Sequence, residues 1–372
     1  MVEIEPTDVR GALSWSIASD AVAASITVTG AKVAPVVFRS DDCTATPYSL
    51  APWAPGTVPG VPPLLDALRG DFFCLPFAEQ PDGPLHGEPA SNDWSLVAQS
   101  DSSITVHLDT SDSGASIDKT VAVRPGETVL YQEFLVNGLD GSYSYGTHPI
   151  LDFSHEDEGS ARISTSRMLW CSTHPGLFSD PAQGETQILA QGATFESLEA
   201  IPTADGGSLD MSRYPTAPGH EDLVMLANDP AAGRLGWSAA VFRDFVWYSL
   251  KDVTAFPATL LWISNGGRTQ PPWSSQHVGR LGIEDVCSYF AVSLDASRAD
   301  LLRDQGIRTT RTFESDVPVA LRIVQGVAFT PTGFGRVTDI SADVPGQITI
   351  TDESGISITT PVDWSFVLTD EA

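Results

Sequence analysis

The sequence predicts an all-β protein, a large antiparallel β-sandwich with few short helices. Three observations support this fold class. β-branched apolar residues alternate with polar ones in many segments, which is typical of antiparallel strands with one solvated face. The chain of 372 residues contains 31 Gly and 27 Pro, which suits many short strands joined by turns. Helical periodicity is rare along the chain.

The individual elements follow from local patterns. Ile26 and Val28, and later Ile104, Val106 and Leu108, alternate with Thr or His and predict strands. A hairpin is expected around Ser354-Gly355, between two alternating isoleucine segments. Two helical segments are expected, a short turn over 62–68 and a helix over 297–305 that is capped by Asp295 or Ser297 and ended by Gly306.

The domain organisation is expected to be simple. No internal repeat of about 20–50 residues is visible, which argues against a propeller or a solenoid. No linker-like change in composition divides the chain. We therefore expect a single domain over 1–372, with an extra strand segment at about 331–372.

Charge and cysteine usage exclude several classes of partner. The chain has 20 Lys and Arg against 48 Asp and Glu, a net charge of −28, which disfavours binding to nucleic acids and to anionic membranes. The four cysteines contain no CxxC pair and indicate reduced thiols, mostly buried. The first residues are acidic where a secretion signal would be basic, and no apolar stretch approaches the length of a membrane span. The expectation is a soluble cytoplasmic protein, with its oligomeric state left open.

Four of the seven histidines show no sign of chemistry. His107 lies on the polar phase of a strand, and His155 lies in an acidic loop. His174 and His277 have no obvious partner in the sequence. We expect all four to be structural or surface residues.

Two other histidines and one glutamate stand out. His86 lies in a loop rich in Gly and Pro, and His148 precedes a proline at the end of a strand-like segment. Loops and strand ends on a rigid sheet are where sites are usually built. Glu284 and Asp285 interrupt an apolar strand, where a carboxylate is either paired or has its pKa raised by burial, and a raised pKa fits it for general base catalysis.

In chain order these segments resemble the aldose 1-epimerase (galactose mutarotase-like) superfamily. The resemblance spans roughly residues 20–330, and its weight comes from the order and spacing of short motifs. The motifs are the segment 30–36, Arg69-Gly70, Leu75-Pro76-Phe77, Leu85-His86-Gly87 with Trp94, Thr147-His148-Pro149-Ile150, and Leu281-Gly282-Ile283-Glu284.

The resemblance implies a β-supersandwich that interconverts the anomers of a free aldose without a cofactor or metal. Glu284 would take the proton from the anomeric hydroxyl, while His148 would protonate the ring oxygen. The implied sugar-binding residues are Arg69, His86 and the central acid Asp222, with Trp262 and Trp273 as aromatic platforms. The sequence departs from the family in having Asp285 after Glu284, in reading HGE at residues 86–88, and in its C-terminal extension.

Three alternatives stay open. A non-catalytic carbohydrate-binding β-sandwich protein would keep the cleft aromatics without needing both His148 and Glu284. A sugar-phosphate epimerase of the same fold would require a cluster of basic residues, and none is evident. A metal site could use His86, Glu88 and His148, because a His-x-Glu spacing on a strand places both side chains on one face.

Overall fold

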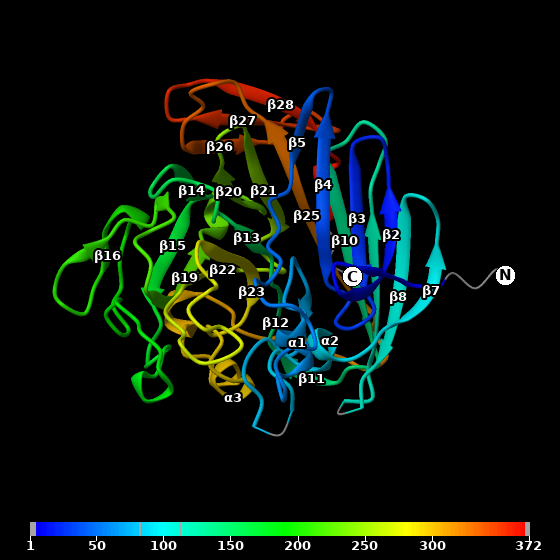
Figure 1. The fold of residues 1–372 in the computed structure, drawn as a ribbon, viewed down its shortest axis with the longest axis horizontal. Coiled ribbons are helices and arrows are strands. Elements are labelled where there is room, and N and C mark those ends of the chain that lie inside the picture. The colour runs from blue at the N-terminus through cyan, green and yellow to red at the C-terminus, as the bar shows by residue number, and fades with distance from the viewer. Residues whose placement is uncertain (1–4, 82, 112, 369–372) are drawn as a thin grey trace.

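The structure is a computed structural model that describes residues 5–81, 83–111 and 113–368. It consists mainly of antiparallel strands, as expected, with three α-helices of four or five residues among the described residues (Figure 1). These are α1 (Pro63–Asp66), α2 (Glu88–Ser91) and α3 (Leu294–Arg298). In this part of the chain no helix is both long and apolar enough to span a membrane.

The largest sheet has nine strands. The sheet order is β18-β14-β20-β21-β25-β10-β9-β8-β7, and neighbouring strands pair antiparallel. The strands are β7 (Ser95–Gln99), β8 (Ser103–Asp109), β9 (Ser116–Ala122), β10 (Val129–Asn137), β14 (Ala161–Thr165), β18 (Arg213–Tyr214), β20 (Leu235–Val241), β21 (Phe245–Asp252) and β25 (Val319–Phe329).

A seven-stranded sheet carries the candidate site. Its strands run in the order β15-β19-β22-β23-β12-β6, and β13 also pairs with β23. Their bounds are β6 (Phe73–Cys74), β12 (Tyr145–Thr147), β13 (Ile150–Asp152), β15 (Met168–Thr173), β19 (His220–Asn228), β22 (Ala258–Asn265) and β23 (Arg280–Cys287).

Smaller sheets complete the chain. A five-stranded sheet at the N-terminal end contains β1 (Thr7–Val9), β2 (Ala12–Ala18), β3 (Val22–Thr27), β4 (Val33–Ser40) and β5 (Cys43–Ala45). Two-stranded ribbons pair β11 (Gly141–Tyr143) with β24 (Arg311–Phe313), and β16 (Ile201–Pro202) with β17 (Ser208–Leu209). Short 3-10 turns lie at Pro181–Gln183, Leu198–Ala200, Pro230–Ala232, Arg303–Gln305 and Trp364–Val367.

The side chains of the central strands alternate between two apolar layers. On β22, Leu261 and Ile263 enter the main core, which also includes residues of the nine-stranded and five-stranded sheets. Leu260 and Trp262 point the other way, into a second cluster that includes α1 residues such as Leu64. The seven-stranded sheet is therefore buried on both faces, and the face turned away from the main core carries the site described below.

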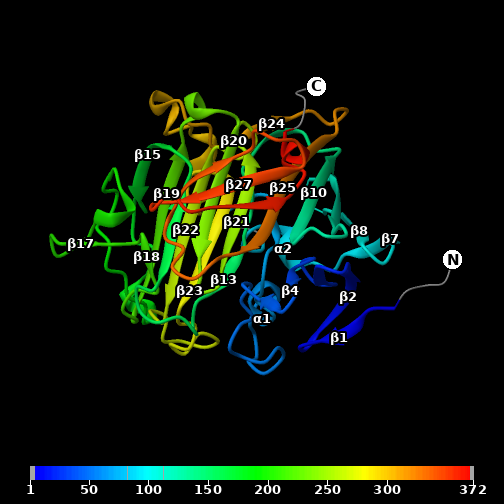
Figure 2. The ribbon, with the colours of Figure 1, turned by 90° about the horizontal axis from the view of Figure 1, so that it is seen from above.

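The C-terminal strand segment forms its own sheet. β26 (Val337–Ser341), β27 (Gln347–Asp352) and β28 (Ser357–Pro361) contribute to a third apolar cluster with residues of the nine-stranded sheet such as Trp237 and Tyr248. Figure 2 shows β27 crossing the direction of the strands beneath it. The expected hairpin at Ser354-Gly355 is confirmed, because β27 and β28 pair on either side of it.

One helix prediction is partly wrong. The helix expected over 297–305 begins earlier, at Leu294, and its N-cap is Ser293, whose hydroxyl accepts a hydrogen bond from the Ala296 N–H. Asp300 has a φ of 52°, which breaks the helix before the 3-10 turn at Arg303–Gln305. The turn expected over 62–68 is confirmed as α1.

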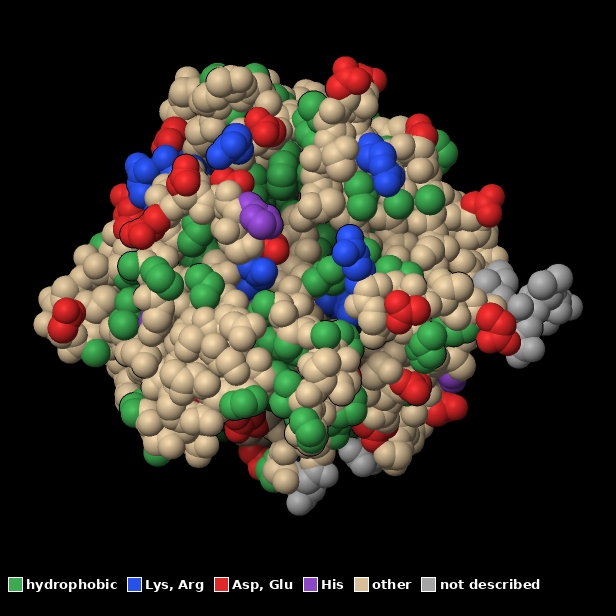
Figure 3. Space-filling model, in the orientation of Figure 1, with side chains coloured by type: hydrophobic (Ala, Val, Ile, Leu, Met, Phe, Trp, Pro, Cys, Tyr) green, Lys and Arg blue, Asp and Glu red, His purple; other side chains and the backbone are tan. Residues whose placement is uncertain are grey.

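Most of the cysteines are buried, as expected, and the lysines are buried as well. Cys74, Cys171 and Cys287 are buried free thiols, and Cys43 is exposed. The only lysines of the chain, Lys32, Lys119 and Lys251, are fully buried. Basic side chains on the surface are therefore arginines, and the face in Figure 3 shows basic side chains scattered among acidic ones.

Candidate active site

A cavity of about 450 Å³ lies on the outer face of the seven-stranded sheet. This volume is in the range of about 300–1,000 Å³ that is typical of small-molecule sites. Strands β19, β22 and β23 form its floor, and α1 and several loops form its walls. The residues that line it are Leu64, Leu65, Leu68, Phe72, Glu79, Leu85, His86, His148, His174, Leu177, Phe178, Leu223, Trp262, Arg268, Trp273, Glu284, Ala291 and Val292.

Glu284 enters the cavity from the middle of β23. Its neighbours Ile283 and Asp285 lie on the opposite face, where Asp285 pairs with the buried Lys251 at 2.8 Å. Gly282, two residues earlier on the cavity face, leaves room for the carboxylate, because a Cβ there would lie 2.5 Å from Glu284 Oε1. The Glu284 side chain is 2% exposed, and burial raises its pKa well above the usual value.

His148 approaches Glu284 from a remote part of the chain, just after β12. Its Nε2 lies 3.2 Å from Glu284 Oε1, although that oxygen makes no hydrogen bond of good geometry within the described residues. The imidazole stacks on the Phe72 ring, with centroids 4.6 Å apart. Burial, with a smaller contribution from His86, lowers the pKa of His148 well below its usual value.

The backbone of His148 is anchored to the core. Its N–H donates to the carbonyl of Phe72 at 3.0 Å and to Asp71 Oδ1 at 2.9 Å. Asp71 Oδ2 in turn accepts from the Nε2 groups of Gln132 at 2.6 Å and Gln325 at 2.8 Å. A network of buried polar groups therefore fixes the strand end that presents the imidazole.

His86 completes the polar corner of the cavity. Its ring lies edge-on to that of His148, with centroids 5.2 Å apart, and burial lowers its pKa to about 3. His86 has a φ of 62°, and its loop closes through the His86 N–H, which donates to the Ala78 carbonyl at 2.9 Å. A side chain held in this sparsely populated backbone region is commonly found at functional sites.

Glu88 does not join these histidines, so the alternative metal site is not assembled. Its carboxylate accepts hydrogen bonds from the N–H and hydroxyl of Ser111 and from Asn92. Across residues 5–81, 83–111 and 113–368, no group of three His, Cys, Asp or Glu side chains is placed to hold a metal ion.

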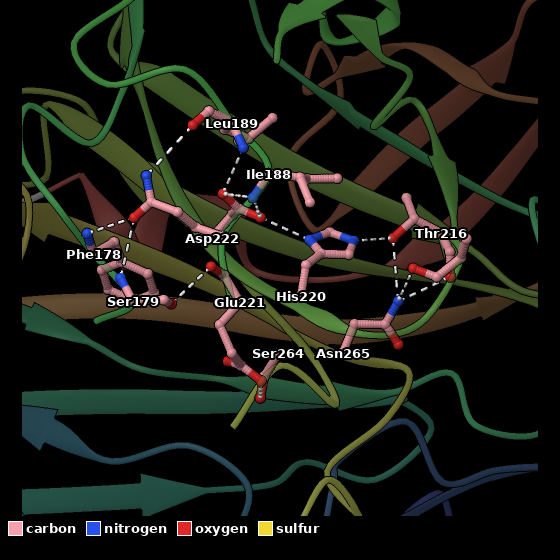
Figure 4. Close-up of polar contacts among 12 residues, drawn as sticks. Phe178, Ser179, Ile188, Leu189, Thr216, His220, Glu221, Asp222, Ser264 and Asn265 are labelled. Carbon is pink, nitrogen blue, oxygen red and sulfur yellow. Dashed lines mark hydrogen bonds and ion pairs between the residues drawn. The ribbon is translucent and has the colours of Figure 1, made fainter. Parts of the chain in front are cut away.

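Arg69 and Asp222 are not brought to the cavity. The Arg69 guanidinium donates to the backbone carbonyls of Val9 at 2.9 Å and Arg10 at 3.0 Å. Asp222 points to the main-core side of β19, where Oδ1 accepts the Leu189 N–H at 3.0 Å and Oδ2 lies 2.7 Å from His220 Nδ1 (Figure 4). Both side chains therefore form hydrogen bonds with backbone groups outside the cavity.

Two polar residues at or near the cavity, Glu221 and Arg268, were not predicted from the sequence. Glu221 lies on the opposite face of β19 from Asp222, and its Oε1 accepts from the Ser264 hydroxyl at 3.0 Å. Burial raises the pKa of Glu221 to about 7. Arg268, which follows Gly266-Gly267, lines the cavity with its Nε 3.2 Å from Glu185 Oε1 and 4.0 Å from Glu221 Oε2. The adjacent glycines were the one sequence signal that could have singled out Arg268.

Aromatic side chains surround the arginine. Its guanidinium carbon lies 4.8 Å from the ring centre of Trp273 and 5.7 Å from that of Trp262, and both tryptophans line the cavity as expected. Trp94 is elsewhere, buried in the main core with its Nε1 donating to the Pro89 carbonyl at 3.0 Å.

The remaining histidines divide into three groups. His174, expected to have no role, lines the cavity beside Phe178. His277 lies behind it, stacked on Trp262, and its Nδ1 is 2.7 Å from the Ser264 hydroxyl. His107 and His155 are away from the cavity, with His107 paired to Asp118 at 2.7 Å and His155 exposed.

Comparison with solved structures identifies the architecture. A galactose mutarotase-related enzyme from Lactobacillus acidophilus superposes with a TM-score of 0.54 at 12% identity, covering 86% of this chain and 98% of the other. A galactose mutarotase-like protein from Lactobacillus casei gives 0.54 at 14% identity, covering 85% and 100%. The chain has the galactose mutarotase-like fold.

A candidate aldose 1-epimerase from Escherichia coli K12 gives the same result for the mutarotase-like fold, with a TM-score of 0.56, 13% identity and coverage of 86% and 100%. No family profile matches the sequence, and no curated protein matches it. The superpositions establish the mutarotase-like fold, and the identities of 12–14% leave the activity to be argued from the site itself.

Proposed function

We propose that the chain is an aldose 1-epimerase, which interconverts the anomers of a free aldose by acid–base ring opening. The observation that carries the proposal is the contact of Glu284 and His148 at 3.2 Å in a cavity of small-molecule size. An acid and a base of this kind, both withdrawn from water, are what proton exchange at a sugar hemiacetal requires.

The reaction needs one proton shared by the pair. Burial favours the neutral forms, a protonated Glu284 and an uncharged His148. Transfer of that proton across the 3.2 Å contact gives the carboxylate and the imidazolium without any change in total charge. The carboxylate then accepts the proton of the anomeric hydroxyl while the imidazolium donates to the ring oxygen.

The bond between the anomeric carbon and the ring oxygen breaks in this step, and its electron pair stays on the oxygen. The resulting aldehyde rotates about its bond to the next carbon, and addition of the ring hydroxyl to its other face returns both protons. The exchange consumes no co-reactant, which is consistent with a cofactor-free reaction. The Trp262 and Trp273 rings offer apolar surfaces for the C–H faces of the sugar.

The charges in the cavity argue against the alternative of a sugar-phosphate epimerase. Among the described lining residues Arg268 is the one arginine or lysine, and it is already close to Glu185 and Glu221, so a phosphate would find little uncompensated positive charge. The net charge of −28 disfavours nucleic-acid and anionic-membrane partners. We place the reaction in the cytoplasm, where free thiols such as the buried Cys74 and the exposed Cys43 stay reduced.

Saturation-transfer NMR on a panel of aldoses tests the proposal. We expect the protein to accelerate anomer exchange of at least one sugar, and Glu284→Gln to abolish most of that acceleration. Loss of one acid–base group typically costs a factor of about 10²–10⁴. Glu314→Gln, at an exposed position, is the matched control and is expected to keep full activity. Binding of aldoses with no acceleration by the wild type would instead identify a carbohydrate-binding protein.

A further inference from the structure

Side chains that can hydrogen-bond to sugar hydroxyl groups are the minority of the cavity lining. Beyond Glu284, His148 and His86, they are Glu79, His174, Arg268 and the indoles of Trp262 and Trp273. Arg268 already contacts Glu185, and His174 Nδ1 lies 3.2 Å from the backbone carbonyl of Gly176. A hydroxyl group that enters such a site without a partner loses its hydrogen bonds to water, at a cost in affinity.

Most of the remaining lining is apolar. One wall consists of Leu64, Leu65 and Leu68, from α1 and the turn that follows it. The opposite boundary comes from loops after β15 and β23, with Leu177, Phe178, Ala291 and Val292. Leu177 is 51% exposed and Leu85 is 38% exposed, so large apolar side chains also reach the solvent at the edge of the cavity.

The α1 wall is held firmly in place. The buried ammonium of Lys32 donates to the carbonyls of Leu64 at 2.9 Å, Pro63 at 3.2 Å and Ala67 at 3.3 Å. The indole Nε1 of Trp53 donates to the Leu65 carbonyl at 2.9 Å. These buried donors hold in a fixed position the backbone that presents the leucines.

We propose that the substrate is an aldose carrying an apolar group in place of a hydroxyl, as a deoxy methyl or a capped hydroxyl, away from the anomeric carbon. This inference rests on the proposed epimerase function and names its substrate class. The anomeric centre lies at Glu284 and His148, and the apolar group packs against the leucine wall or the Leu177–Val292 boundary. Such a substrate leaves fewer hydroxyl groups unsatisfied and buries its apolar group against matching side chains.

Matched sugar pairs test this substrate class. D-galactose is compared with D-fucose, D-glucose with D-quinovose, and D-mannose with D-rhamnose, because each second sugar carries a methyl group where the first carries a hydroxymethyl group. The kcat/KM for anomer exchange, corrected for the spontaneous rate, is measured by saturation-transfer NMR. We expect roughly a tenfold preference for the deoxy member of at least one pair, equivalent to about 1.4 kcal/mol.

Variants of the boundary locate the contact. The double variant Leu177→Asn/Val292→Thr introduces hydrogen-bonding groups while keeping the number of side-chain heavy atoms, and it should lower the deoxy preference at least twofold. Leu301→Asn/Val317→Thr makes the same changes at exposed positions outside the cavity and should leave the preference unchanged. A preference that the cavity variant leaves unchanged would overturn the assignment of this boundary.

The outcomes separate the two proposals. Equal kcat/KM within every pair, or a preference for the hydroxylated member, would overturn the apolar substrate class and leave the epimerase function standing. No acceleration of either member of any pair would count against the epimerase function itself and against the substrate class with it.

Discussion

Gly282→Ala should separate catalytic activity from stability. Gly282 pairs with Trp262 across β22 and β23, and its missing side chain provides the space that the Glu284 carboxylate occupies. A Cβ at this position would lie 2.5 Å from Glu284 Oε1, whereas ordinary contacts begin at 3.4 Å. The carboxylate must therefore retreat by nearly 1 Å.

The expected loss follows from that displacement. A misplacement of about 1 Å at a reacting group costs on the order of 10²-fold in rate. The fold should lose little, because the carboxylate is the tip of a flexible side chain and the Trp262 Cβ, 3.1 Å away, needs to move only slightly. We expect kcat/KM for anomer exchange to fall about 10²-fold, while the free energy of unfolding changes by less than about 2 kcal/mol.

The control is a glycine with equally little space but no catalytic neighbour. At Gly326, in the nine-stranded sheet, a Cβ would lie 2.5 Å from the Tyr248 hydroxyl oxygen. Gly326→Ala should lower the urea midpoint and keep kcat/KM near the wild-type value. A folded Gly282→Ala protein with kcat/KM within about twofold of wild type would refute the placement of the Glu284 carboxylate.

Three further predictions follow from the burial of polar and apolar groups. The pH profile of kcat/KM should be bell-shaped, with its acid limb below pH 6.5 and its alkaline limb above pH 4.5, because the lowered pKa of His148 and the raised pKa of Glu284 bound the one-proton state. A profile that rises through pH 6.5 as an ordinary imidazole loses its proton would contradict this. Asp71→Asn should lower the free energy of unfolding by about 2–4 kcal/mol in urea titrations, because the amide NH2 group would face N–H groups that now donate to the Asp71 carboxylate. A loss below about 0.5 kcal/mol would argue against the network. A chain ending at Thr330 should bind a hydrophobic dye and aggregate, because it uncovers apolar side chains such as Trp237; an equally stable monomer would show that the C-terminal sheet is dispensable.

Protonation of the buried histidines should also appear in stability. The folded-state pKa values of His86 and His148 lie below the usual imidazole value, so below about pH 6.5 the unfolded chain binds more protons and the folded state loses stability as the pH is lowered. His86→Gln should reduce this slope by up to about 1.4 kcal/mol per pH unit, measured by urea titration between pH 5 and pH 6.5. An unchanged slope would show that His86 is not buried in its neutral form.

The strands and the two side chains that meet in the cavity could be predicted from local patterns. Period-two alternation locates strands because one face of each strand meets the core, as in the expected strand through Ile104, Val106 and Leu108, which is β8. Glu284 was visible because a carboxyl group within an apolar strand requires an explanation. His148 was visible because it follows a strand and precedes a proline.

The other residues predicted to bind sugar could not be placed in the same way. Asp222 and Glu221 are adjacent on β19, and alternation alone does not say which of the two faces meets the cavity; the predicted Asp222 lies on the main-core side. The Arg69 side chain reaches carbonyls about 60 residues away in sequence, a contact that no local pattern encodes. Arg268 lies in a loop, where periodicity is absent.

A double-mutant cycle on Glu284 and His148 tests the central claim most directly. The kcat/KM for anomer exchange is measured for Glu284→Gln, His148→Asn and the double variant, with folding checked by circular dichroism. If the two side chains share one proton, each single change should remove nearly all of the acceleration, and the double variant should lose little more than either. Losses that multiply as independent factors, or a single variant with near-normal turnover, would contradict it.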